Sequence, residues 1–251
     1  MDSPFYTNSH QIVQQGRERI FVDYRNMYNK PNVGNFGAAL LGAAVLANTE
    51  MDHNFQNWYR KNVHSEFTDE LAKVSKQFGE GWIIVPAVAA CAVSYRSWQV
   101  WRGMPDGDCP FGEFTDRTMR GFLVGAPTVL FFQPMIGSDR PSSGESYWKP
   151  FQDVNGVSGH AFIGAVPFLT IAHMSDKPCV KGVFFALSTL TAWSRINDDA
   201  HYLSQALLGW YIAYLSVRAV STTDGTVLPR GLTIFPVRQD QYIGMGIRFQ
   251  F

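Results

Sequence analysis

The chain has 251 residues, enough for one large domain or two small ones. Its 21 basic residues balance 21 acidic residues, so no electrostatic attraction to nucleic acid is indicated and we expect no nucleic-acid partner. The three cysteines lack metal-ligand spacing and suggest no disulfide framework. No apolar stretch near the start resembles a signal peptide. The mean hydropathy of −0.10 lies between soluble and membrane classes.

The sequence predicts an all-α fold. After a polar N-terminal segment, 1–32, six apolar stretches recur through a helical domain that we place at 33–220. Most are shorter than the roughly 20 apolar residues that span a bilayer. Their small residues suit close helix contacts, so a six-helix core bundle is expected, either in water or in a membrane. The stretches cover residues 33–48, 82–95, 122–136, 161–174, 183–193 and 203–220.

A different pattern fills the segment between the first two apolar stretches. From Met51 to Phe78, apolar residues recur mostly every three or four positions with charges between them. This periodicity predicts two amphipathic helices, broken near Ser65 and Thr68, with Thr68 in the position of an N-cap. We expect these helices to cover the bundle; lying on a lipid surface is the alternative.

Two further segments lack the helical pattern. Residues 137–158 are polar and without periodicity, which is typical of a loop. The C-terminal tail, 221–251, contains the alternating runs "LTIF" and "YIGMGIRFQF". Alternation of this kind predicts strands, so a short β-hairpin is expected there.

Candidate functional residues gather in three motifs. The first is "QPMIGSDRP", which ends on Arg140 and Pro141; the second is "SGH", Ser158 to His160; the third is "SRINDDAHYLSQ", with Arg195, His201 and Gln205. Taken singly, each motif is weak, because an arginine is usually a solvated charge and a lone histidine is usually structural. Their order and spacing carry more information than any one of them.

Together the motifs resemble the signature of the type-2 phosphatidic acid phosphatase and vanadium haloperoxidase superfamily. That signature reads K-x6-R-P, then P-S-G-H, then S-R-x5-H-x3-D. Arg140-Pro141, Ser158-Gly159-His160 and Ser194-Arg195 with His201 match it in order, with the expected five residues between Arg195 and His201. The resemblance covers roughly 33–220, where the apolar stretches fall at the places of the family's core helices.

The resemblance implies a phosphoric ester hydrolase. His201 would be the nucleophile that forms a phosphohistidine, and His160 the acid that protonates the leaving oxygen. Arg140 and Arg195 would hold the phosphoryl oxygens with their guanidinium groups. The hydroxyl of Ser158 and the amide of Gly159 would complete this anion site. No metal or other cofactor is required; vanadate would be bound only in a haloperoxidase.

The sequence departs from the family signature at three positions. Gln133 stands at the family lysine, Gln205 at the family aspartate and Val157 at the family proline. Gln133 removes a charge directed at the phosphate, whereas Gln205 can still orient His201, four residues earlier on the same helix face. We expect Val157 to be tolerated. Lys149 is a candidate replacement for the lysine, and Asp198 or Asp199 for the aspartate.

These observations lead to one expected function and two alternatives. We expect a membrane phosphatase that hydrolyses a phosphate monoester or diphosphate, with a lipid phosphate or another small phosphorylated molecule as substrate. More Lys and Arg lie on the side opposite the motifs, which predicts an extracytoplasmic active site. A vanadium-dependent haloperoxidase and a catalytically weakened phosphate-binding protein are the alternatives.

Overall fold

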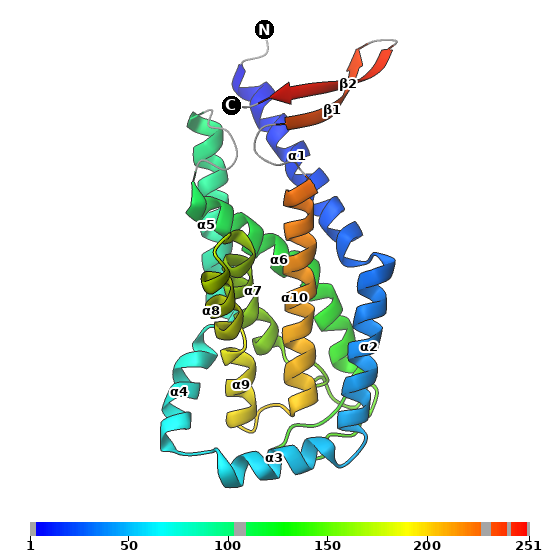
Figure 1. The fold of residues 1–251 in the computed structure, drawn as a ribbon, viewed down its shortest axis with the longest axis vertical. Coiled ribbons are helices and arrows are strands. Elements are labelled where there is room, and N and C mark those ends of the chain that lie inside the picture. The colour runs from blue at the N-terminus through cyan, green and yellow to red at the C-terminus, as the bar shows by residue number, and fades with distance from the viewer. Residues whose placement is uncertain (1–3, 103–108, 227–231, 240–241, 250–251) are drawn as a thin grey trace.

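The computed structural model describes residues 4–102, 109–226, 232–239 and 242–249. Within these residues the chain forms ten helices and one antiparallel pair of strands (Figure 1). The elements are α1 (Pro4–Met27), α2 (Lys30–Ala47), α3 (Met51–Asn62), α4 (Glu66–Gln77), α5 (Gly81–Arg102), α6 (Pro110–Ile136), α7 (Gly159–Met174), α8 (Pro178–Leu187), α9 (Leu190–Asn197), α10 (Leu203–Thr226), β1 (Leu232–Gln239) and β2 (Tyr242–Phe249).

The expectation of an all-α core is confirmed, but the count of six helices is wrong. Apolar stretches mark only apolar helices, so the count omitted the polar helix α1 and did not include the amphipathic helices α3 and α4, which were predicted separately. The stretch at 183–193 is also divided in two. At the break, the hydroxyls of Ser188 and Thr189 donate to the carbonyls of Phe185 and Ala186 at 2.6 and 2.8 Å, so side chains compete with the helical backbone pattern.

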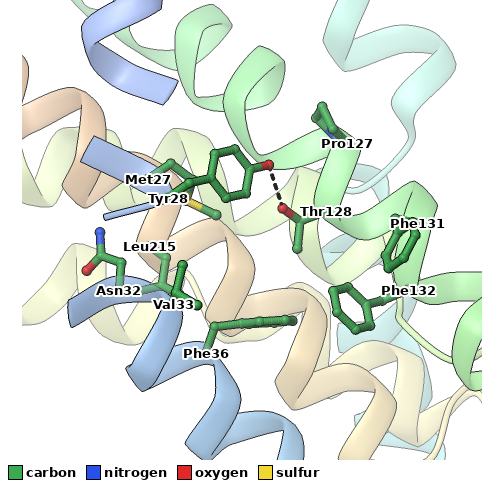
Figure 2. Close-up of a pocket in the computed structure, with 10 residues that line it drawn as sticks. All are labelled: Met27, Tyr28, Asn32, Val33, Phe36, Pro127, Thr128, Phe131, Phe132 and Leu215. Atoms are coloured by element: carbon green, nitrogen blue, oxygen red, sulfur yellow. Dashed lines mark hydrogen bonds between the residues drawn. The ribbon is translucent and has the colours of Figure 1, made fainter. Parts of the chain in front are cut away.

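Within the polar segment 1–32, the described residues 4–32 form α1 and the start of α2, and α1 packs against α6 and α10. The two helices join at Asn29, whose side chain accepts a hydrogen bond from the Asn32 backbone N–H at 2.8 Å and caps α2. Beside this joint, the Tyr28 hydroxyl lies 2.9 Å from Thr128 Oγ1 of α6 (Figure 2). An apolar pocket of about 450 Å³ lies between the joint and α6.

The two amphipathic helices predicted for residues 51–78 are present as α3 and α4. The break lies where it was expected, but Ser65 is the N-cap and Thr68 is the third helical residue. The Ser65 hydroxyl accepts from the Thr68 backbone N–H, and the Thr68 hydroxyl accepts from the Ser65 backbone N–H, which forms a capping box. The prediction chose the wrong residue because either hydroxyl suits the position.

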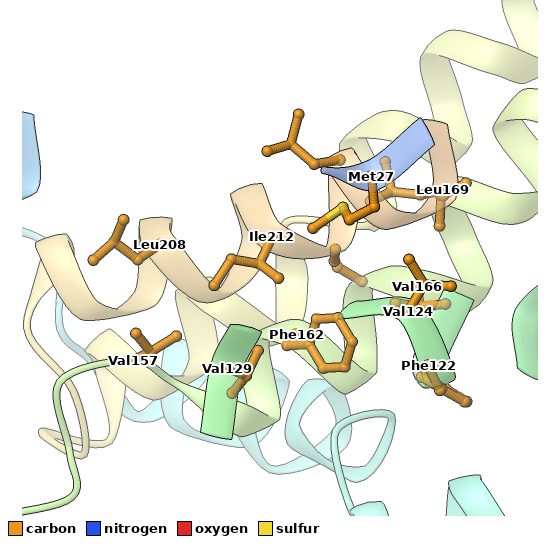
Figure 3. Packing of buried hydrophobic residues seen from close by; sticks show 14 of the residues in the cluster. Met27, Phe122, Val124, Val129, Val157, Phe162, Val166, Leu169, Leu208 and Ile212 are labelled. Carbon is orange, nitrogen blue, oxygen red and sulfur yellow. The ribbon is translucent and has the colours of Figure 1, made fainter. Parts of the chain in front are cut away.

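The main hydrophobic core lies among α6, α7 and α10 (Figure 3). Phe162 of α7 packs edge to face with Phe122 of α6, with 6.3 Å between ring centroids. Gly125 of α6 allows this approach, because a Cβ there would lie 2.4 Å from the Phe162 ring. A smaller cluster around Tyr59 and Ala161 connects α3 and α9 to this core.

The tail forms the β-hairpin that its alternating sequence predicts. β1 and β2 pair antiparallel, with Leu232 opposite Phe249 and Gln239 opposite Tyr242. Within the described residues, these two strands constitute the whole of the sheet structure.

One helix of the described residues, α6, is long and apolar enough to cross a membrane. A second span is added only if α4 and α5, which bend by 41° at their junction, are taken together. The membrane-spanning six-helix bundle expected from the sequence is therefore supported only weakly. α7 is apolar but, at 16 residues, shorter than a span.

The topology brings the three motifs to one end of the bundle. α6 ends at Ile136, the 137–158 loop follows, α7 begins at Gly159, and the turn at 198–202 joins α9 to α10. These segments lie together at the end of the molecule that α3 crosses (Figure 1). The loop expected at 137–158 is confirmed.

Candidate active site

The second motif forms the start of α7. Ser158 is the N-cap, and its buried hydroxyl accepts from the Ala161 backbone N–H at 3.3 Å. The hydroxyl proton stays available to a further acceptor. Gly159 and His160 occupy the first turn, where backbone N–H groups have no partner inside the helix and attract anions. The local sequence therefore builds a helix terminus of the kind that suits an anion.

The third motif is fixed against the second by backbone contacts. The Ser158 N–H donates to the Gln205 carbonyl at 3.1 Å. Gly209, one turn later on α10, lies so close that a Cβ would be 2.2 Å from the Ser158 carbonyl oxygen. The His201 N–H donates to the Arg195 carbonyl at 3.0 Å, which ties the 198–202 turn to α9. The starts of α7 and α10 thus form one compact unit.

The hydrogen bonds of Gln205 determine the tautomer of His201. The Gln205 Oε1 accepts from the Tyr202 N–H at 3.0 Å, while its Nε2 donates to the Asp139 carbonyl at 2.7 Å and to the Ser138 hydroxyl at 2.9 Å. Because the Tyr202 N–H can only donate and the Asp139 carbonyl can only accept, the Gln205 amide has a single possible orientation. His201 Nδ1, 2.9 Å from the same Oε1, must carry its proton, so Nε2 holds the free lone pair.

His201 is also kept neutral. Its side chain is buried, and burial lowers its pKa to about 3, assisted by the positive charges of Arg195 and Arg140 and by His160. A neutral imidazole with a free Nε2 is the form that can act as a nucleophile. The amide of Gln205 therefore supplies the orienting function of the family aspartate without its charge.

Two guanidinium groups, those of Arg195 and Arg140, lie close enough to the histidines to interact with them electrostatically. Arg195 Nη1 donates to Asp198 at 3.2 Å, whereas its Nε is buried and has no hydrogen-bond partner among the described residues. Burial also lowers the pKa of Arg195. Arg140 extends from the 137–158 loop, and its Nε donates to Asn155 at 2.9 Å. An unpartnered, buried guanidinium donor suits an anionic ligand.

A carboxylate lies beside His160. Its Nε2 lies 3.5 Å from Glu80 Oε1, at the junction of α4 and α5. Burial lowers the pKa of His160, and Arg195 and Arg140 lower it further, whereas Glu80 raises it. The same two arginines therefore lower the pKa values of both histidines. Arg140 and Arg195 thus lie close enough to interact electrostatically with both His160 and His201.

The substituted family positions have partners of their own. Gln133 Nε2 donates to the Val157 carbonyl at 3.1 Å and lies beside Gly159, whose Cβ would be 3.4 Å away. Lys149, a candidate replacement for the missing lysine, pairs instead with Asp139 at 2.7 Å and lowers the pKa of that carboxyl.

The two aspartates considered as replacements for the family aspartate also bind elsewhere. Asp198 pairs with Arg195 at 3.2 Å and with Lys76 at 3.8 Å. Asp199 pairs with Arg60 at 2.9 Å and accepts from Gln56 at 2.6 Å. Gln205 alone supplies the acceptor for His201 Nδ1 within the described chain.

Sequence analysis missed two residues of this site. Glu80 was passed over because "GEG" signals only a break between helices, and no local pattern indicates that it faces His160. Asn155, which holds Arg140, lies in a loop that has no periodicity from which contacts could be derived. Both contacts join segments that are distant or irregular in sequence.

Comparison with known proteins agrees with this arrangement of residues. A family model described as the PAP2 superfamily matches residues 120–227, which include all three motifs. No curated protein and no solved structure matches the chain. The match over residues 120–227 supports a relationship to the PAP2 superfamily, the type-2 phosphatidic acid phosphatase and haloperoxidase group whose signature the motifs resemble.

Proposed function

We propose that the protein is a phosphatase that hydrolyses a phosphate monoester or diphosphate through a phosphohistidine on His201. The match of residues 120–227 to the PAP2 superfamily supports a phosphatase-type or haloperoxidase-type activity, and hydrolysis at the coarse level. The observation that carries the proposal is the neutral His201, whose unprotonated Nε2 lies in the neighbourhood of Arg140, Arg195 and His160.

In the proposed first step, His201 Nε2 attacks phosphorus, and an N–P bond forms as the P–O bond to the leaving group breaks. His160 gives its proton to the leaving oxygen. In the second step, His160 takes a proton from water, the water oxygen attacks phosphorus, and the N–P bond breaks. Arg140 and Arg195 stabilise the equatorial oxygens, with the Ser158 hydroxyl and the Gly159 N–H as further donors.

Two adjoining pockets support the proposal that the substrate carries an apolar group on its phosphate. One, of about 500 Å³, is lined by His160, Glu80 and Val85. The other, of about 460 Å³, runs between α5, α6 and α7, reaches Gln133 and Gly159, and is lined mostly by apolar residues. Both pockets share Val85, Gly159 and Ile163, so the acyl or prenyl chain of a lipid phosphate could lie along α6 with its headgroup beside His160.

Membrane association is indicated by α6 and by the family. Large apolar side chains on the outer faces of several helices support it further, because exposed apolar surface of this extent is typical of lipid or protein contacts. Leu41 of α2, Ile83 of α5 and Leu130 of α6 are examples, each more than 60% exposed. From the distribution of Lys and Arg, we propose that the active site faces the extracytoplasmic side.

The function can be tested by phosphate release from phosphatidic acid in detergent micelles. We expect turnover by the wild type, inhibition by vanadate, and a loss of at least about 10³-fold for His201→Ala. His64→Ala, which changes a half-exposed histidine paired with Asp69, is the matched control and should retain wild-type turnover. A folded His201→Ala variant with near-normal activity would contradict the nucleophile.

The same assay separates the alternatives. Halide oxidation by peroxide that depends on added vanadate would identify a haloperoxidase, in which His201 Nε2 and the arginines would hold vanadate. Phosphate or vanadate binding without either activity would identify a non-catalytic phosphate-binding protein. Either result would overturn the phosphatase assignment.

A further inference from the structure

The junction of α4 and α5 is pressed against the first turn of α7. A Cβ at Gly79 would lie 2.7 Å from the His160 carbonyl oxygen and 2.7 Å from Thr191 Cγ2. A Cβ at Gly81 would lie 2.8 Å from Ile163 Cδ1. Glycines on both sides of Glu80 therefore allow the junction to approach α7 closely. The contact brings a residue far outside the three motifs to the mouth of the site.

Glu80 is held in place by its backbone. Its carbonyl accepts from the N–H groups of Ile83 and Ile84 at 3.0 and 2.9 Å, which begins α5. Its carboxylate and the imidazole of His160 line the same pocket, with Oε1 and Nε2 3.5 Å apart. The side chains are 35% and 38% exposed, so the pair is accessible to a substrate and to solvent.

The charges that face His160 are otherwise positive. Arg195 of α9 and Arg140 of the 137–158 loop disfavour its protonated form, and His201 lies close enough to interact with it. Glu80, from the α4–α5 junction, is the group that favours protonation. The two histidines thus have opposite kinds of partner, because His201 is held by an amide and His160 by a carboxylate. This difference matches the two roles, since a nucleophile must be neutral and an acid must be protonated.

We propose that Glu80 is a positioning residue for His160. The Glu80 carboxylate holds the Nε2–H of His160, and this contact directs the Nδ1–H of His160 toward the leaving oxygen. The proposal rests on the proposed function. As the P–O bond breaks, the proton passes from Nδ1 to the leaving oxygen, while the Nε2 proton remains on the imidazole beside Glu80. The carboxylate lies outside the motif region and acts only through His160.

Leaving-group dependence separates this role from a structural one. p-Nitrophenolate departs without full protonation, whereas an alkoxide requires the proton. Glu80→Gln should therefore reduce kcat about tenfold or more on an alkyl phosphate, and less than about twofold on p-nitrophenyl phosphate. On the alkyl phosphate, kcat of Glu80→Gln should begin to fall with rising pH at a lower pH than kcat of the wild type. Glu80→Asp should recover part of the rate.

Glu145→Gln is the matched control, because Glu145 forms the other Glu–His pair at this end, with His53 at 2.7 Å. It should leave both rates and the pH profile unchanged. Equal losses on the two substrates in Glu80→Gln would overturn the proposal, as would an unmoved pH profile.

A second measurement does not require turnover. Proton NMR titration of the imidazole, with His160→Gln to assign the signal, gives the pKa of His160 directly. Glu80→Gln should lower that pKa, since the change removes the neighbouring negative charge. If the wild type releases no phosphate, the proposed function fails, whereas a lowered pKa still shows the pairing. An unchanged pKa overturns the role of Glu80 whether or not the protein is a phosphatase.

Discussion

At the residue scale, the candidate site differs from the family signature by two glutamines, Gln205 and Gln133. Gln205 is fully buried and uses both ends of its amide, accepting from His201 and Tyr202 and donating to Ser138 and Asp139. The side chain of Gln133 makes a single hydrogen bond within the described residues, to the Val157 carbonyl, and is only partly buried. Restoring the family residue should therefore have opposite effects at the two positions.

We expect Gln205→Asp to lower kcat/KM by about tenfold or more, because the shorter side chain removes the donors to two buried oxygens, and each lost partner costs about 1–3 kcal/mol. Gln133→Lys keeps a donor near Val157 and adds a positive charge beside Gly159, so it should raise kcat/KM by up to about tenfold. Steady-state kinetics on phosphatidic acid measure both. A gain for Gln205→Asp would show that the amide network is dispensable.

The burial of His201 also makes the stability of the protein sensitive to acid. Its pKa is about 3 in the folded protein and has an ordinary value of 6.5. Between these values the unfolded chain binds a proton that the folded protein does not. The free energy of unfolding should therefore fall as the pH drops below 6.5, by up to about 1.4 kcal/mol per pH unit from this residue.

Urea unfolding of the wild type and of His201→Gln, at several pH values from 7 to 4, measures this contribution. The variant should lose stability less steeply with falling pH than the wild type. Parallel pH dependences for the two proteins would contradict a neutral, buried His201 in the folded state.

At the element scale, the site depends on how closely α7 and α10 approach. Gly209 of α10 lies against the Ser158 carbonyl, and Ala206, one turn earlier, is fully buried. The Ser158 N–H to Gln205 carbonyl hydrogen bond forms at the same contact. The helices therefore act together as the support of His160 and His201, one histidine near the start of each.

Gly209→Ala should separate the two helix starts, because its Cβ would lie 2.2 Å from a backbone oxygen. Overpacking of this kind typically costs about 1–3 kcal/mol, and displacement of the histidines should reduce kcat by about 10²-fold. Gly182→Ala, in α8, is the matched control, since its Cβ meets no atom within 4 Å. The control should be neutral or more stable in thermal unfolding, by up to about 1 kcal/mol.

A Gly209→Ala variant with normal stability and normal turnover would show that the start of α7 can move without consequence. The close approach would then have no role in the geometry of the site.

At the scale of the whole molecule, a buried ionic cluster includes Asp224 near the end of α10, whereas the third motif lies at the start of that helix. Arg120 of α6 donates to Asp23 of α1 at 2.7 and 2.8 Å, to Asp224 of α10 at 2.8 Å and to Asp116 at 3.3 Å. Asp23 is fully buried. Three helices that are distant in sequence are thus joined by one guanidinium.

Arg120→Met should destabilise the protein by about 3–5 kcal/mol, since it leaves buried carboxylates without a counter-charge. Adding Asp23→Leu should recover part of the loss, because it removes the carboxylate that is most buried. Denaturant unfolding measures both changes, and turnover per folded molecule should stay near the wild-type value in each. If the single variant were as stable as the wild type, the cluster would make no net contribution.

The parts that could be predicted from the sequence are those with a local signal. The spacing from Arg195 to His201 and the Ser158-Gly159-His160 triplet indicated the candidate site, and periodicity located α3 and α4. The helix count was wrong because apolar runs do not report polar helices such as α1. Contacts between distant segments, such as Glu80 with His160, leave no pattern in either segment and required the structure.

The choice of an amide at position 205 affects how the site responds to its surroundings. A carboxylate titrates and its attraction to an imidazole is weakened by salt, whereas an amide has no net charge. The hydrogen bond that orients His201 should therefore keep the same form from acid to alkaline solution and across ionic strengths. Any salt dependence of kcat/KM then reports on Arg140 and Arg195, which attract the anion, and on the Glu80–His160 pair, rather than on the orientation of the nucleophile.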